Sequence, residues 1–281
     1  MAITITTICE NTAGVLGVLG EWGISVLVET DDERVLLDSG GGLSFAHNAD
    51  LLAGFFGIDL GGVSHIVLSH GHADHTGGLV EALVRTGPVE VIAHPDCWAA
   101  KYADLPGREP RSIGMPFAQE ELAALGATFN VSREPVWITD SIVTTGEIPM
   151  VTEYEDIEPN LVVREGDAIV PDPLLDDQAL IVVTDAGLVV ILGCAHHGIV
   201  NTLYHAREIT GVDTVNTVIG GAHLIRAPEE RVVLTAAALQ ELGVQRVGAC
   251  HCTGLAASAM LAQQLGDVFA FNNAGSRVAV P

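Results

Sequence analysis

The sequence predicts a layered α/β protein with helices on the outside of its sheets. Strand patterns and helix patterns alternate over most of the 281 residues. Apolar residues make up 48% of the chain, so a substantial core can form. The longest apolar runs fall far short of the ~18 residues that span a membrane. We expect a single domain over residues 1–281, with loop-rich excursions near 95–135 and 147–177.

The first third of the chain consists of short strands separated by helices. Residues 3–8 alternate apolar side chains with threonine, the pattern of a half-buried strand. Asp31-Asp32 stands between two apolar segments and predicts a hairpin turn, and Ser39-Gly40-Gly41-Gly42 ends the second of them. The predicted strands are 3–8, 24–29, 34–38, 63–69 and 89–93, and the predicted helices are 43–56 and 79–84.

The last third is the most regular part of the pattern. Asp185-Ala186-Gly187 predicts a second hairpin, and Pro228 suits the first turn of a helix. The predicted strands are 180–184, 188–192, 214–219 and 245–249, and the predicted helices are 199–209, 228–242 and 258–265.

The two excursions differ in composition. Residues 95–135 contain five prolines and one short helix pattern at 119–125. Residues 147–177 are irregular and acidic, with four prolines. Such a segment is either a lid or mobile loop over a site, or a disordered acidic surface loop, and the sequence leaves both interpretations open.

The charge and the cysteines exclude several classes of protein. The net charge is −24, from 36 acidic and 12 basic residues, and such a field repels nucleic acid and anionic membranes. We therefore expect neither as a partner, and a small molecule as substrate. The first residues lack the basic start and apolar stretch of a secretory signal, so we expect a cytoplasmic protein. Five scattered cysteines argue against a disulfide framework.

The most informative segment is residues 70–75, which read His-Gly-His-Ala-Asp-His between an apolar strand and a helix start. Imidazole nitrogen and carboxylate oxygen are the ligands that zinc and its neighbours prefer. Four such groups are too many for one metal with an open coordination position. We predict two metals, with His70 and His72 on one and Asp74 and His75 on the other. A surface turn without a metal is the alternative, but burying four ionisable groups unpaired is costly.

Histidines also follow three other predicted strands. Each of these strand ends is succeeded by glycine, threonine or a helix start. We therefore expect one edge of the sheets to gather six histidines: His70, His72, His75, His196, His223 and His251.

With these motifs in view, the chain resembles the metallo-β-lactamase-fold superfamily, and within it the dihydropterin synthase-like branch. The resemblance spans nearly the whole chain and is carried by segments 21–25, 37–40, 74–79, 145–149, 193–202, 220–224 and 250–254. It implies a four-layer αββα sandwich with a metal site at one edge of its two sheets. It also implies hydrolysis, commonly of phosphoesters, and in that branch a pterin-linked phosphate.

The sequence departs from the superfamily pattern at two ligand positions. A Gly-His-Thr-like segment usually supplies a third histidine to the first metal, and here Glu147 follows Gly146. The aspartate that usually bridges the metals corresponds to Cys194. We expect His196 to be the missing ligand, ahead of Cys194 and Glu147, which would then lie behind the ligands. His251 matches the final histidine and would join Asp74 and His75 on the second metal.

Other side chains have both a functional and a plain structural interpretation. His223 is predicted to contact substrate or act as an acid, or to be a structural histidine. Asp38 is predicted to orient a ligand imidazole from behind, or to cap a turn. Asn201 opens a helix whose free N–H groups would suit a phosphate, or it merely caps that helix. Cys250 and Cys252 are interpreted as packing residues.

The expected chemistry is hydrolysis by a metal-activated water, with Asp74 orienting the nucleophile. One or two zinc ions are expected, with manganese or iron as substitutes, because such ions lower the pKa of bound water toward ~7. The substrate is expected to be a small anion, with a phosphoester, possibly cyclic or pterin-linked, ahead of a lactone or thioester. An iron-binding redox protein or a non-catalytic metal-binding protein is the alternative of another class.

Overall fold

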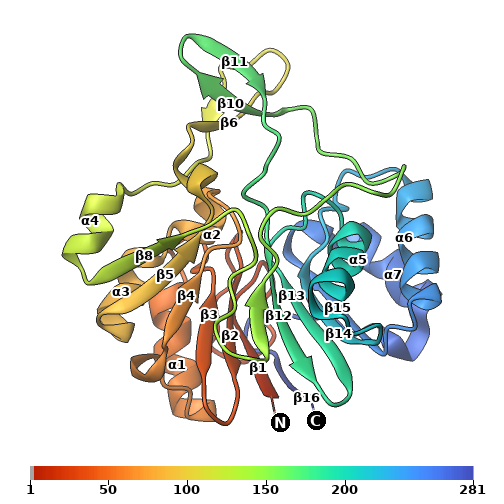
Figure 1. Cartoon of the computed structure of the whole chain (residues 1–281), viewed down its shortest axis with the longest axis horizontal. Helices are drawn as coiled ribbons and strands as arrows, with labels where there is room; N and C mark the ends of the chain where they lie inside the picture. The colour runs from red at the N-terminus through yellow and green to blue at the C-terminus, as the bar shows by residue number, and fades with distance from the viewer. Residues whose placement is uncertain (1–2, 281) are drawn as a thin grey trace.

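Two β-sheets stand face to face in the computed structural model, and helices cover the outer side of each (Figure 1). The structure describes residues 3–280. The four-layer αββα arrangement expected from the sequence is confirmed. No helix in residues 3–280 is long and apolar enough to cross a membrane.

The first sheet has seven strands in the order β16-β1-β2-β3-β4-β5-β8. Strands β1 to β3 form an antiparallel meander, and β3, β4, β5 and β8 run parallel. The strands are β1 Ile3–Cys9, β2 Ser25–Glu29, β3 Arg34–Leu37, β4 His65–Val67, β5 Val89–Ala93, β8 Ala127–Val131 and β16 Arg277–Val280. The helices between them are α1 Phe45–Phe56, α2 Ala73–Thr76, α3 Leu79–Thr86 and α4 Gln119–Ala124, with 3₁₀ turns at Leu60–Gly62 and Pro95–Trp98.

The second sheet has five strands in the order β15-β14-β13-β12-β9. Strands β13, β14 and β15 are parallel, so their carboxyl ends meet at one edge. The strands are β9 Ile142–Thr144, β12 Ala179–Thr184, β13 Gly187–Leu192, β14 Val215–Gly221 and β15 Arg246–Cys250. Three helices follow them, α5 Ile199–Thr210, α6 Glu229–Glu241 and α7 Leu255–Leu265, with 3₁₀ turns at His251–Thr253 and Gly266–Val268.

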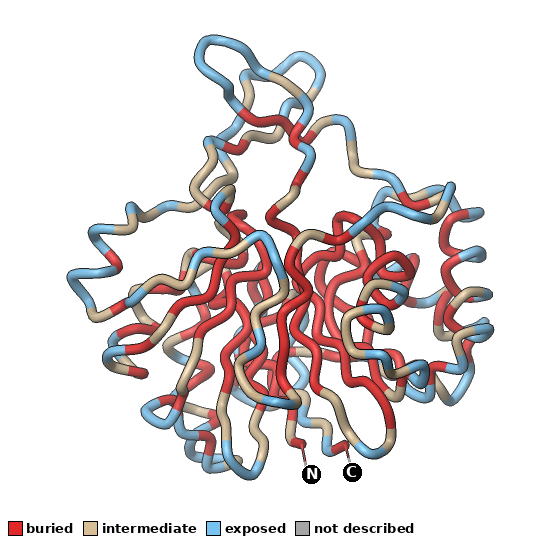
Figure 2. Tube along the Cα trace, viewed as in Figure 1, coloured by how far each residue is buried: buried red, intermediate tan, exposed pale blue. Residues whose placement is uncertain are grey.

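The core lies in three layers, one between the sheets and one under each set of helices. Ile5, Val67 and Ile191 are among the side chains that fill the space between the sheets. Figure 2 shows the buried trace concentrated in the two sheets, with exposed residues on the helices and outer loops. Because both sheets are buried on both faces, their strands are nearly continuous apolar runs.

A third, four-stranded sheet stands above the sandwich (Figure 1). It is built from β6 Lys101–Ala103, β7 Arg111–Ser112, β10 Leu161–Glu165 and β11 Ala168–Pro171. Strand β10 pairs with β6, so the two excursions join each other. The expectation that residues 147–177 are irregular is therefore wrong for 161–171, whereas 147–160 and 172–177 contain no helix or strand. Strands β10 and β11 form a hairpin around Gly166-Asp167, a local turn signal that the sequence interpretation missed, whereas the pairing of β10 with β6 joins segments far apart in the chain.

Candidate metal centre

Strand β4 delivers the His70–His75 turn to the edge where the parallel strands of both sheets end. The turn is held by the backbone: Ser39 N donates to His75 O at 2.7 Å, and Gly71 N donates to Asp176 Oδ2 at 2.8 Å. Glycine is required at position 71, because a Cβ there would lie 2.0 Å from Cys97 O. The metal-binding pattern therefore depends on close backbone packing as well as on its histidines.

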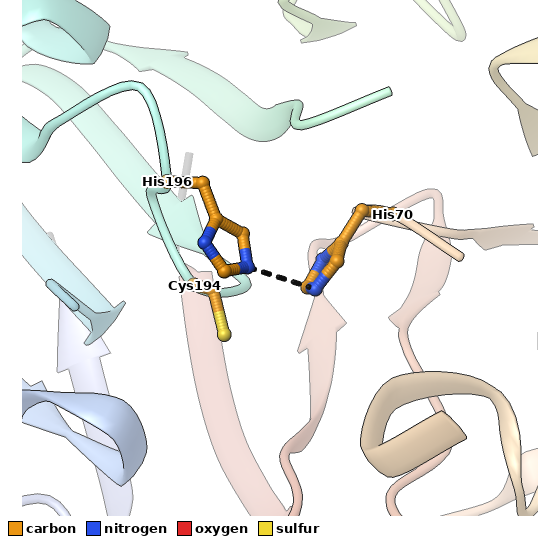
Figure 3. Close-up of side chains that lie close together, drawn as sticks. All are labelled: His70, Cys194 and His196. Carbon is orange, nitrogen blue, oxygen red and sulfur yellow. Dashed lines mark hydrogen bonds between the residues drawn. The ribbon is translucent and has the colours of Figure 1, made fainter. Parts of the chain in front are cut away.

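Three imidazoles converge at one side of this turn. His72 Nδ1 lies 2.9 Å and His196 Nε2 lies 3.3 Å from His70 Nε2. Figure 3 shows His70 and His196 pointing toward each other, with Cys194 beside them. Burial lowers the pKa of His72 to about 3, and burial with the neighbouring imidazoles lowers the pKa of His70 and of His196 well below the usual value. Neutral imidazoles offer lone pairs, so this group suits a divalent metal.

Asp74, His75 and His251 gather on the other side. Asp74 Oδ2 lies 3.8 Å from His75 Nε2 and 3.4 Å from His251 Nε2. The far nitrogens are engaged: His75 Nδ1 contacts Asp38 Oδ2 at 2.7 Å, and His251 Nδ1 contacts Asn11 Oδ1 at 2.9 Å. Each contact turns Nε2 of its imidazole toward the centre. Asp38 therefore makes the contact that the sequence suggested, whereas the contribution of Asn11 had no sequence signal.

The two sides differ in charge. Burial opposes ionisation of both Asp74 and His75. The attraction between them, with Asp38 behind, outweighs that cost, raises the pKa of His75 to about 9 and lowers the pKa of Asp74. The second group is therefore an ion pair in the absence of metal. A metal that binds there would displace the proton of His75, because a ligating histidine must be neutral.

Cys194 lies between the two groups. Its Sγ is 3.1 Å from His75 Nε2, and it lies within 4.8 Å of ligand atoms of His70 and His196 and also of His75 and His251. The sequence placed Cys194 behind the ligands, but its sulfur faces both groups. His196 lies in the first group beside it. The donor atoms of this edge fit one or two divalent metals.

Backbone strain concentrates at the same edge. Ala195, His223 and His251 all have left-handed backbone conformations, with φ of 52°, 46° and 53°. Such conformations are costly for residues with a side chain and persist where the surrounding structure holds them. Here they turn the chain sharply after β13, β14 and β15, so that three strand ends point side chains into one place.

Two sequence-predicted residues lie outside the centre. Glu147 accepts hydrogen bonds from Arg133 Nη1 at 2.6 Å and pairs with His94 Nε2 at 3.1 Å, and it is in none of the ligand groups. Asn201 is buried, and its amide is used by Val151 N, Thr152 N and His197 O. The predictions that Glu147 supports the ligands and that Asn201 binds substrate are therefore wrong.

The start of α5 is occupied by a carboxylate of the chain itself. Glu155 accepts hydrogen bonds from Val200 N at 2.9 Å and Asn201 N at 2.8 Å. Gly198 makes room for it, because a Cβ at 198 would lie 2.2 Å from Glu155 Cδ. Glu155 thus occupies the helix start at which the sequence analysis expected a phosphate.

His223 and Cys252 complete the edge. They form a further group with Cys194 whose ligand atoms lie within 4.8 Å of one another. The ring of His223 is 4.2 Å from that of His196, and its Nε2 is 3.5 Å from Glu158 Oε1. The interpretation of Cys252 as a packing residue assumed a strand through 250–252. Strand β15 ends at Cys250 and a 3₁₀ turn follows, so the alternation does not apply.

A pocket of about 250 Å³ opens above the centre. Its walls include His72, Asp74, Cys194, His196, His223 and Cys252, and its rim includes Trp22 and Arg111. Arg111 comes from the small upper sheet and is exposed. Trp22 is 55% exposed and its ring lies 5.4 Å from that of His251. A cation and a flat apolar face therefore border the pocket.

The small sheet is tied to the metal-binding turn by the chain's single lysine. Lys101 is 1% exposed, and its Nζ lies 2.8 Å from both Asp172 Oδ2 and Asp176 Oδ1. Asp176 then accepts the Gly71 N–H through its other oxygen. Burial raises the pKa of Asp176, because the lysine offsets only part of the cost of burying the carboxylate.

The fold and the clustered ligands define a metal-dependent hydrolase fold of the metallo-β-lactamase type. The chain belongs to the metallo-beta-lactamase superfamily, whose family model matches residues 23–208. It is 31% identical to the 7,8-dihydropterin-6-methyl-4-(beta-D-ribofuranosyl)-aminobenzene-5'-phosphate synthase of Methanocaldococcus jannaschii, over 97% of this chain and 95% of that protein. The resemblance to the dihydropterin synthase-like branch is thus confirmed.

Solved structures agree with this assignment. Tm1679, a metal-dependent hydrolase of the beta-lactamase superfamily, superposes with a TM-score of 0.83 at 29% identity and 99% coverage of both chains. Zn(2+)-bound PqqB from Methylobacterium extorquens shares the fold alone, with a TM-score of 0.55 at 12% identity and 99% coverage of both chains. The family implies divalent metal binding, and the ligand groups above are where this chain would bind it.

Proposed function

We propose that the protein is a zinc-dependent hydrolase that cleaves a phosphoester of a small molecule with a planar, pterin-like portion. The observation that carries the proposal is the convergence of buried ligand atoms from four strand ends beneath an open pocket. His70, His72 and His196 would hold one zinc ion, and Asp74, His75 and His251 would hold the other. Cys194 would bridge them, and its thiolate favours zinc over manganese.

Bound zinc supplies a water of lowered pKa and polarises the phosphoryl oxygen. Asp74 lines the pocket, where its carboxylate would help to hold a metal and to orient the attacking water. His223 faces the pocket beside it. Burial opposes protonation of His223, but Cys252 and Glu158 outweigh that cost and raise its pKa to about 10. A protonated His223 can donate its proton to the leaving oxygen.

The rim favours a phosphoester over a lactone or thioester. Arg111 is a cation at the mouth of a pocket in a protein of net charge −24, so it gives an anion a local partner. The exposed face of Trp22 offers a stacking surface for a flat ring. The curated relative is named for a dihydropterin product with a phosphate, which combines the same two features.

A substrate panel tests the function. Metal-free protein reconstituted with zinc or manganese would be assayed on bis(4-nitrophenyl) phosphate, a cyclic nucleotide, a homoserine lactone and a thioester. We expect hydrolysis of the phosphodiesters, with zinc the better metal. Hydrolysis of the lactone or thioester alone, or no hydrolysis with zinc bound, would contradict the proposal.

Substitution of Cys194 tests the bridging position. Cys194→Ala should weaken zinc binding by at least the ~10–100-fold that loss of a supporting contact costs, because it removes a ligand from both sites. Cys194→Asp should restore much of that loss, since a carboxylate also binds zinc. Zinc content after dialysis against a weak chelator measures both.

Cys250→Ala is the matched control for the Cys194 variants. It removes a buried thiol that contacts Asn272 Nδ2 rather than the centre. Equal zinc content in Cys194→Ala and Cys250→Ala would show that Cys194 is no ligand.

A further inference from the structure

Two cysteines lie together at the metal centre, and only one of them, Cys194, is a proposed zinc ligand. Cys194 Sγ and Cys252 Sγ lie within 4.8 Å of each other. Cys252 Sγ also lies 3.5 Å from Cys194 O. The sulfur of Cys252 therefore lies against the backbone of Cys194, and the two sulfurs must close from within 4.8 Å to the ~2.05 Å of a disulfide bond.

The backbone between the two cysteines is shaped for this approach. They follow β13 and β15, which are separated by β14. Gly221 ends β14 between them, and a Cβ there would lie 2.5 Å from Cys252 Sγ and 3.2 Å from Cys194 Cα. The missing side chain at position 221 lets the thiol of Cys252 cross the intervening strand.

The pair is also open to small molecules. Both cysteines line the pocket of about 250 Å³ above the centre. Their exposed fractions are small, 3% for Cys194 and 2% for Cys252, but the other three cysteines, at 0% to 6%, do not line this pocket. A hydroperoxide that enters the pocket reaches Cys194 and Cys252 together.

We propose that Cys194 and Cys252 are an oxidation site, which a hydroperoxide converts into a disulfide that removes Cys194 from the metal ligands. The disulfide rests on the geometry of the two thiols. The loss of metal rests in addition on the proposed function, in which Cys194 bridges the zinc ions.

The chemistry balances in two steps. The thiolate of one cysteine attacks a peroxide oxygen, the O–O bond breaks, and a sulfenic acid and an alcohol form, with water in place of the alcohol for hydrogen peroxide. The second thiol attacks that sulfur, the S–S bond forms, and the S–O bond breaks to release water. Two thiols lose two electrons and two protons, and the peroxide is reduced.

The test treats the full-length protein with hydrogen peroxide, in zinc-loaded and metal-free forms. We expect the number of free thiols, counted after denaturation, to fall from five to three, with loss of two hydrogen masses. Dithiothreitol should restore all five. The zinc-loaded form should react more slowly and release zinc as its thiols disappear, which a chromogenic chelator reports.

Three variants assign the disulfide. Cys252→Ala and Cys194→Ala should each form no disulfide, whereas Cys250→Ala should still lose two thiols. Five thiols remaining in both forms of the natural protein, or mass gained as sulfinic acid instead of mass lost, would overturn the proposal. If the reduced protein took up no zinc, the proposed function would fail, and the thiol count of the metal-free form would still decide the disulfide.

Discussion

Replacing His72 with alanine is expected to abolish hydrolysis and to lower the zinc content of the purified protein. His72 Nδ1 lies 2.9 Å from His70 Nε2, so its loss removes one of three imidazoles from the first metal group. Loss of a contact that merely orients a ligand costs ~10–100-fold in metal affinity, and loss of the ligand itself should cost more. Metal analysis and the phosphodiester assay on the same preparation measure the two effects.

His47→Ala is the matched control for His72→Ala. His47 is exposed on α1, and its Nε2 contacts only the backbone oxygen of Gly17. It should keep the zinc content and the rate of the natural protein. A His72→Ala protein with normal metal content and normal rate would refute the proposed metal centre.

Replacing Lys101 with methionine is expected to destabilise the protein by about 3–5 kcal/mol. The substitution leaves Asp172 and Asp176 buried without their cation, and such carboxylates are costly. Asp176 also holds Gly71 N, so the metal-binding turn should loosen with it. Urea denaturation of the metal-free protein measures the free energy of unfolding, and zinc affinity measures the loosening.

Two further variants show whether the buried charges cause the loss. Adding Asp172→Asn and Asp176→Asn to Lys101→Met should recover most of the stability, because no unpaired charge is then buried. Arg133→Met breaks a surface pair with Glu147 and should change the free energy of unfolding by only ~0–1 kcal/mol. Equal losses in Lys101→Met and Arg133→Met would contradict the account.

The effect of Lys101 on stability should not change between pH 7 and pH 9. Burial opposes its charge, but Asp176 and Asp172 outweigh that cost and raise the pKa of Lys101 above its usual value. A raised lysine pKa means that the stabilisation is fully present below the unfolded value of ~10.4 and is lost as the pH rises through the folded value. Denaturation of the natural protein and of Lys101→Met at both pH values measures this stabilisation, and a difference in free energy of unfolding that shrinks by pH 9 would contradict the raised pKa.

The fold and the ligand histidines were predictable because their signals are local. Apolar runs ending in glycine and histidine mark the carboxyl ends of strands, and parallel strands bring those ends to one edge. His70 and His196 therefore meet in one ligand group and His251 in the next, as expected from segments far apart in the chain, and both groups include Cys194. Each of the three histidines lies within four residues of the carboxyl end of its strand, so the strand pattern alone places it at that edge.

The remaining features depend on contacts that no local pattern shows. The acidic segment 147–177 suggested either a lid or a disordered surface loop, yet Glu155 caps α5 and Asp176 pairs with Lys101. Asn11 reaches His251 from the far end of the chain. Cys252 leaves the strand pattern because the backbone turns at His251. In each case the deciding partner is distant in sequence.

The position of Arg111 has a consequence for how substrate preference could diversify on this scaffold. All proposed zinc ligands stand on the sandwich, whereas this arginine belongs to the small upper sheet. An exchange of the upper sheet between relatives would therefore alter the entrance of the pocket and leave the zinc ligands intact. The replacement sheet must keep one contact. Without the Lys101–Asp176 pair, Asp176 would no longer be held where it accepts the Gly71 N–H, and the metal-binding turn would loosen.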